Sequence, residues 1–162
     1  MKEGLTIRKI SFRERPITLP ADYRPLYKIA MLTMVLKLCC RSERATLLKL
    51  HLFSWCLTSE KRMHQLAAYV HRNYTGDSIV WGIEPAVNRA LVIANAEGIC
   101  LHEERGTYVL AERGKAFYDL IAADNELFSL EKVFLRSMGK NKITDARIEA
   151  MSNQWSIENA EN

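Results

Sequence analysis

The chain has 162 residues, a length that allows one compact domain with extensions or two very small domains. Hydrophobic residues make up 48% and charged residues 26%, which excludes a wholly disordered chain, and no apolar run approaches the roughly 18 residues of a membrane span. The net charge of +4 conceals an asymmetry, because residues 1–75 carry 14 Lys and Arg against 5 Asp and Glu, whereas residues 76–162 carry 9 against 14. A basic half attracts DNA phosphates or an acidic partner, and the alternative interpretation is two differently solvated faces.

An extended arm is predicted for residues 1–20. Apolar and polar residues roughly alternate from Leu5 to Phe12, which is typical of a short strand, and two prolines then favour an extended connection. No apolar signal-peptide segment follows the first residues, so we expect a soluble cytoplasmic protein. Three apolar side chains of the arm are candidates for adding a strand to a neighbouring subunit: Ile7, Ile10 and Phe12. The candidates for contact with DNA or an acidic partner are Arg8, Lys9, Arg13, Arg15 and Arg24.

Two helices that are apolar on nearly every face follow the arm. The first begins near Tyr23, and the second is predicted over Ala45–Leu57. A helix that is apolar all round is buried almost all round, so we expect this pair to form the centre of the core. We also expect the pair to leave surplus apolar surface for a partner, so that the isolated chain self-associates.

The rest of the chain is predicted to continue as helices around one hairpin. Ser59 caps an amphipathic helix, and the next helix has Pro85 in its first turn and Gly98 at its end. A hairpin over residues 99–110 turns at Arg105-Gly106. Three further helices begin near residues 112, 128 and 144. The expected organisation is a mainly α domain over residues 21–155, in which helices follow the hairpin, and a flexible tail over 156–162.

The predicted order is three helices, a fourth helix that ends in Gly, a hairpin and a further helix. This order of elements is typical of winged-helix proteins. The segments Glu97-Gly98-Ile99 and Tyr108-Val109-Leu110-Ala111-Glu112-Arg113-Gly114 resemble the wing and following turn of winged-helix regulators. Ala111 stands where those regulators have a capping Thr, so the cap of the next helix has to come from elsewhere. The resemblance implies a winged-helix domain with a short N-terminal β arm, a two-stranded wing and extra C-terminal helices.

The helix before the wing is poorly equipped to read DNA. Its predicted solvent face carries Asn88, Val92 and Asn95, with Arg89 as its only cation, whereas a major-groove reader needs several base-contacting side chains. The wing adds Glu103 and Glu104 where a DNA backbone would lie. We therefore interpret Asn88, Val92 and Asn95 as residues that dock a protein partner.

No motif for catalysis, a cofactor or a metal is found in the sequence, so we expect neither enzymatic activity nor a bound cofactor. The four cysteines are interpreted as free, buried thiols, and the alternative of a zinc site from Cys56, His64 and His71 fits no known ligand spacing. Glu112 and Lys115 match half of a nuclease motif by coincidence, and His51 is interpreted as a core histidine.

The pattern as a whole resembles the small middle component of bacterial ABC-three-component defence systems, the group that includes Lamassu. Four segments carry the resemblance: YRPLYKIAML (23–32), LLKLHLFSWCL (47–57), VLAERGKAF (109–117) and ITDARI (143–148), the last followed by Trp155. The resemblance implies a non-catalytic adaptor that links an SMC-like ABC ATPase sensing foreign DNA to an effector, often a nuclease. The alternatives are a dimeric winged-helix transcription regulator and an isolated interaction domain.

Overall fold

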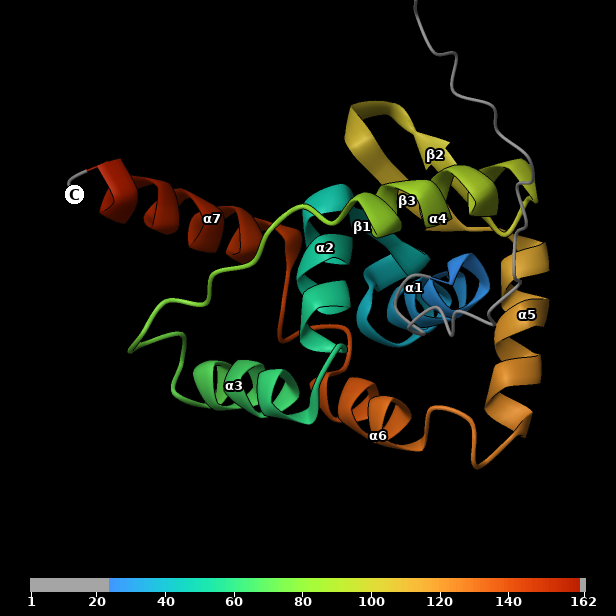
Figure 1. Cartoon of the computed structure of the whole chain (residues 1–162), viewed down its shortest axis with the longest axis horizontal. Coiled ribbons are helices and arrows are strands. Elements are labelled where there is room, and N and C mark those ends of the chain that lie inside the picture. Colours follow the sequence, from blue (N-terminus) through green and yellow to red (C-terminus); the bar gives the residue numbers. More distant parts are fainter. Residues whose placement is uncertain (1–23, 161–162) are drawn as a thin grey trace, which may run out of the picture.

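Helix α1 (Pro25–Cys39) forms the centre of the structure. The computed structural model describes residues 24–160, with the side chains of residue 155 and residues 157–160 excepted. Ten of the fifteen residues of α1 are buried, because α2, α4, α5 and α6 all pack against it. Figure 1 shows α1 nearly end-on with these helices around it. The prediction that the first apolar helix lies in the core is therefore confirmed.

Helix α2 (Leu47–Cys56) begins two residues later than predicted, because Thr46 is its N-cap and accepts a hydrogen bond from the backbone N–H of Lys49. None of its residues is exposed, so this helix also belongs to the core. The expectation that the two apolar helices leave surplus apolar surface is wrong for α2, and on α1 it holds only for Leu26. The other large exposed apolar side chains lie elsewhere: Val80, Ile83, Val92, Leu101, Leu120, Leu127, Leu130 and Val133.

A small antiparallel sheet stands against the helices. The strands β1 (Arg44–Thr46), β2 (Cys100–Glu103) and β3 (Thr107–Leu110) are ordered β1-β3-β2, so that the predicted hairpin gains a third strand. The sequence analysis placed Ala45 and Thr46 in a helix, and this is wrong, since Ala45 pairs with Tyr108 of β3. Three residues are too few to show the alternation that identifies a strand, and a distant pairing partner decides their conformation.

The remaining helices agree with the predicted order. They are α3 (Glu60–His71), α4 (Pro85–Ala96), α5 (Glu112–Ala123), α6 (Ser129–Met138) and α7 (Asp145–Ala160). Ser59 caps α3, Pro85 stands at the start of α4, and Gly98 follows α4 with a φ of 68°. These start and stop signals are confirmed, because each depends only on local backbone chemistry.

Gly114 explains why α5 packs closely on the hairpin. A Cβ at this position would lie 2.1 Å from the carbonyl oxygen of Ile99, and the backbone N–H of Ala111 donates to that same oxygen at 3.0 Å. Ala111 is the N-cap of α5 and makes no side-chain cap hydrogen bond. The tight approach needs glycine because any side chain here would collide with backbone.

Helix α7 extends away from the body beside α2 (Figure 1). Thr144 Oγ1 accepts a hydrogen bond from the Arg147 N–H, and Ile143 and Ile148 are both buried, so Thr144 caps the helix and the two isoleucines form an apolar staple beside the cap. The helix continues past the expected boundary at residue 155 and ends at Ala160, so residues 156–160 are helical rather than a tail. None of the helices within residues 25–160 has the length and apolar content needed to cross a membrane.

The described residues thus form a mainly helical fold with a small three-stranded antiparallel sheet. The predicted arm over residues 1–20 lies outside the described residues, and so does the side chain of Trp155. Helix α4 and the hairpin that follows it carry the side chains from which the candidate site is built.

Candidate functional site

Helix α4 divides into a buried face and a solvent face along the predicted line. Val87, Ala90, Leu91 and Ala94 are buried, because their spacing places them on the side that packs against α1. The predicted docking residues Asn88, Val92 and Asn95 are all exposed. Val92 is 70% exposed, so the middle of this solvent face is apolar.

Asn88 is held in place by a histidine from the core. The side-chain oxygen of Asn88 lies 3.1 Å from His51 Nε2, and the backbone N–H of Glu84 donates to His51 Nδ1 at 3.1 Å. Because Nδ1 accepts, the neutral ring carries its proton on Nε2 and donates it to Asn88. Burial lowers the pKa of His51, against opposing effects of the Asn88 hydrogen bond and the Glu84 charge. The interpretation of His51 as a satisfied core histidine is confirmed.

Asn95 is engaged at the other end of the same face. Its side-chain oxygen accepts a hydrogen bond from the backbone N–H of His102 in β2 at 3.0 Å, and the His102 ring packs on Tyr108 with centroids 4.7 Å apart. Both amide oxygens of the solvent face are therefore used inside the molecule. A base-reading role would have to compete with these two hydrogen bonds, which weakens the case for α4 as a DNA-reading helix.

The tip of the hairpin is less acidic than the sequence suggests. Arg44 of β1 forms an ion pair with Glu103, with an N–O distance of 3.1 Å. Glu104 is exposed beside it, in the turn between β2 and β3. Strand β1 thus places Arg44, from the basic half of the sequence, beside Glu103, from the acidic half. At this position the two halves therefore do not form separate basic and acidic surfaces.

Two other cations of the basic half are buried. Lys28 is 1% exposed, and Lys49, which is 2% exposed, donates from Nζ to the carbonyl oxygen of Ile143 at 2.7 Å. The sequence analysis counted both with the cationic side, and this is wrong, because long lysine stems fit the apolar spacing of core helices while their ammonium groups find polar partners inside.

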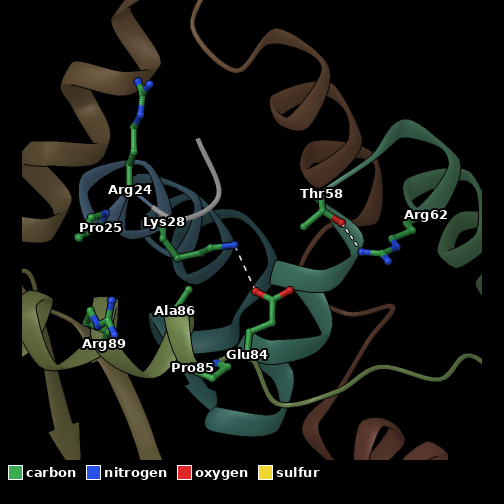
Figure 2. Close-up of a pocket in the computed structure, with 9 residues that line it drawn as sticks. All are labelled: Arg24, Pro25, Lys28, Thr58, Arg62, Glu84, Pro85, Ala86 and Arg89. Carbon is green, nitrogen blue, oxygen red and sulfur yellow. Dashed lines mark hydrogen bonds and ion pairs between the residues drawn. The ribbon is translucent and has the colours of Figure 1, made fainter. Parts of the chain in front are cut away.

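A pocket of about 430 Å³ opens where the first turn of α4 meets α1 and α3. Three guanidinium groups line it, from Arg24 before α1, Arg62 on α3 and Arg89 on α4. Figure 2 shows Arg24 and Arg89 on one side of the pocket and Arg62 on the other, with the Lys28–Glu84 pair between them. The structure therefore brings one predicted contact residue, Arg24, close to the candidate helix.

The floor of this pocket is formed by Lys28 and Glu84, which share a partly buried network with Ser54 of α2. Lys28 Nζ donates to Ser54 Oγ at 3.0 Å and lies 3.3 Å from Glu84 Oε2, and Ser54 Oγ donates to the same carboxylate oxygen at 3.0 Å. Each of these polar groups has a hydrogen-bonding partner within the network. The network therefore fits a structural role that joins α1, α2 and the start of α4.

Arg62 is the pocket residue that the sequence analysis missed. Its guanidinium donates to Thr58 Oγ1 at 2.6 Å and lies 5.1 Å from the centre of the Trp55 ring. Among the described residues, no carboxylate forms an ion pair with Arg62 or Arg89. The sequence gives no signal that Arg62 and Arg89 line the same pocket, because α3 and α4 are joined by a long loop whose path is set by packing.

The cysteines and histidines do not assemble into a metal site in the described part of the chain. Cys56 is buried, whereas His64 and His71 are exposed on α3, and no group of three metal-binding side chains occurs among residues 24–154. Burial raises the pKa of Cys39 to about 12 and of Cys40 to about 11, so both thiols are protonated at neutral pH. Glu112 and Lys115 form a surface ion pair at 2.6 Å.

Seven of the predicted contact residues lie outside the described residues. They are Ile7, Arg8, Lys9, Ile10, Phe12, Arg13 and Arg15.

Comparison of the chain with protein-family models, curated proteins and solved structures gives no match. The functional interpretation therefore rests on the residues of the site itself.

Proposed function

We propose that this protein is a non-catalytic adaptor subunit that docks a protein partner through the solvent face of α4. The proposal rests on two features of that face, the internal hydrogen bonds of its amide oxygens and its exposed apolar side chain. Its two amide oxygens are occupied by His51 and the His102 N–H, and the side chain between them, Val92, is apolar and exposed. Such a face fits a protein surface better than the polar edges of DNA bases.

The finer assignment follows from the sequence resemblance. We infer a winged-helix domain, with the β2–β3 hairpin as its wing, that links an SMC-like ABC ATPase to an effector in an anti-phage or anti-plasmid defence complex. The three-stranded sheet supports this inference, because β1 joins the hairpin to the helical body between α1 and α2. The basic residues of the arm would contact DNA or an acidic surface of the complex.

A winged-helix transcription regulator is the second candidate. The gathering of Arg24, Arg62 and Arg89 around the first turn of α4 favours it, since cations at that end of a reading helix can contact phosphates. The exposed Glu104 at the hairpin turn and the occupied amides of α4 count against it.

Affinity purification of the tagged protein from cells that encode it separates these functions. The adaptor proposal predicts that an SMC-like ATPase and an effector co-purify with it, identified by mass spectrometry. Selection from a random duplex DNA library, carried out on the same preparation, is expected to enrich no sequence. Enrichment of one DNA motif without any co-purifying ATPase would contradict the adaptor proposal and support the regulator.

A further inference from the structure

The pocket beside the first turn of α4 is lined by four cationic side chains and one carboxylate. Lys28 is paired with Glu84 and Ser54 on its floor, so these three groups satisfy one another. Arg62 and Arg89 also line the pocket, and no carboxylate in the described part of the chain forms an ion pair with either. Two guanidinium groups without a carboxylate partner in the described residues make the potential in this cavity positive, so the arrangement points to an anionic ligand.

The positions of these cations restrict the kind of ligand. In Figure 2 the side chains of Arg89 and Arg24 lie on the opposite side of the Lys28–Glu84 pair from Arg62. An anion placed between the two sides would lie beside Glu84, whose side chain is 30% exposed and would repel it. The ligand therefore carries at least two separated negative groups with an uncharged part between them.

The walls of the pocket favour a polypeptide over a nucleic-acid backbone. Pro25, Pro85 and Ala86 supply apolar lining, and the neighbouring residues in sequence, Leu26 and Ile83, are 67% and 70% exposed. Apolar lining beside arginines fits a peptide in which acidic and apolar residues alternate, whereas a DNA backbone presents a regular row of phosphates joined by sugars. A cavity of about 430 Å³ accommodates one or two side chains of such a segment.

We propose that this pocket binds an acidic, partly apolar segment of a protein partner, with Arg62 and Arg89 each pairing with a carboxylate of that segment. The inference rests on the proposed docking role of α4 and adds to it the chemistry of the partner. Arg62 is preorganised for this contact by its hydrogen bond to Thr58 and its position over the Trp55 ring.

The test uses the full-length protein and a fluorescein-labelled peptide of alternating Glu and Leu, with the Gln–Leu peptide as the uncharged probe. Fluorescence anisotropy is expected to show binding of the Glu–Leu peptide and at least about tenfold weaker binding of the Gln–Leu peptide. The double variant Arg62→Gln/Arg89→Gln is expected to weaken binding of the Glu–Leu peptide about tenfold. The matched control Lys61→Gln/Arg136→Gln removes two exposed cations outside the pocket and is expected to change binding less than about twofold.

Because Arg62 also contacts Thr58 and Trp55, the single variant Arg89→Glu, at an exposed position, provides a second measurement that does not disturb those contacts. It is expected to weaken binding at least as much as the double variant. The inference is overturned if the wild-type protein does not bind the Glu–Leu peptide, or if pocket and control variants weaken binding equally. It is also overturned if the pocket variants lose affinity for labelled duplex DNA and keep affinity for the peptide. In each of these cases co-purification of the ATPase would still support the proposed function. Failure of the peptide-binding inference can therefore be distinguished from failure of the adaptor proposal.

Discussion

Two basic pockets of similar size, about 430 Å³ each, lie at the beginnings of α4 and α7, and they use their cations differently. At α7 three of the four lining cations have partners within the fold, since Arg44 pairs with Glu103, Lys49 binds the Ile143 carbonyl and Arg41 binds Asn141, whereas the fourth, Lys140, is exposed. At α4 Lys28 pairs with Glu84 and Arg62 donates to Thr58, but among the described residues neither Arg62 nor Arg89 forms an ion pair with a carboxylate. The comparison indicates that the cations of the α7 pocket mainly hold the fold together, whereas the α4 pocket contains two arginines that we propose to bind a ligand.

The largest effect is expected from breaking the floor of the α4 pocket. Glu84→Ala leaves the Lys28 ammonium buried without its carboxylate, and we expect the free energy of unfolding to fall by about 3 kcal/mol. Urea denaturation measures this loss. Glu104→Ala, at an exposed position, is the control, and an equal loss in both variants would show that the buried pair is not important for stability.

A smaller loss is expected at the α7 pocket. Asp145 Oδ1 accepts hydrogen bonds from the backbone N–H and the hydroxyl group of Thr46, so it ties the start of α7 to β1. Asp145→Ala is expected to lower the free energy of unfolding by about 1–2 kcal/mol and to speed hydrogen exchange in α7. The exposed Glu149 of the same helix provides the control variant Glu149→Ala, which should leave both quantities unchanged.

A pH-dependent effect is expected from His51, which supports the start of α4. Burial lowers the pKa of His51 below 6.5, so below that value the unfolded chain binds a proton that the folded chain does not. The stability that His51 contributes is therefore present above about pH 6.5 and is lost as the pH falls through the folded pKa. Urea denaturation near neutral pH and at mildly acid pH should show a smaller decrease for His51→Gln than for wild type. The same decrease in both proteins would contradict this role, and the exposed His64→Gln is the control.

The smallest effect on stability is expected for the arginines that we assign to a ligand. Arg89→Gln removes an exposed cation that pairs with no carboxylate in the described residues, so the free energy of unfolding should change by less than about 0.5 kcal/mol. A thermal or urea unfolding curve provides the measurement. A loss above 1 kcal/mol would indicate that Arg89, like Arg44, belongs to the fold.

The sequence was sufficient to predict most elements of the fold because their signals are local. Ser59, Thr144, Pro85 and Gly98 mark helix ends through backbone chemistry, and the spacing of Val87, Ala90, Leu91 and Ala94 identifies the buried face of α4. Strand β1 was missed because its conformation depends on pairing with β3, about sixty residues away in the chain.

The candidate site was predictable only in part. The exposed positions of Asn88, Val92 and Asn95 follow from helical spacing, but their internal hydrogen bonds depend on where His51 and β2 lie in the fold. The pocket joins Arg24, Arg62 and Arg89 from three separate segments, and a count of charges along the sequence assigned Arg62 to no site. Such a count also includes Lys28 and Lys49 among the cations of the basic half, although both are buried.

The most direct test of the central claim compares two valines with nearly equal exposure. Val92 on the solvent face of α4 is 70% exposed, and Val133 on α6 is 67% exposed, so replacing either with Glu should perturb folding little and equally. The measurement is co-purification of the proposed partner, an SMC-like ATPase, with each tagged variant. We predict that Val92→Glu abolishes co-purification and that Val133→Glu retains it. Retention of the ATPase by Val92→Glu, or its loss from both variants, would contradict docking through α4.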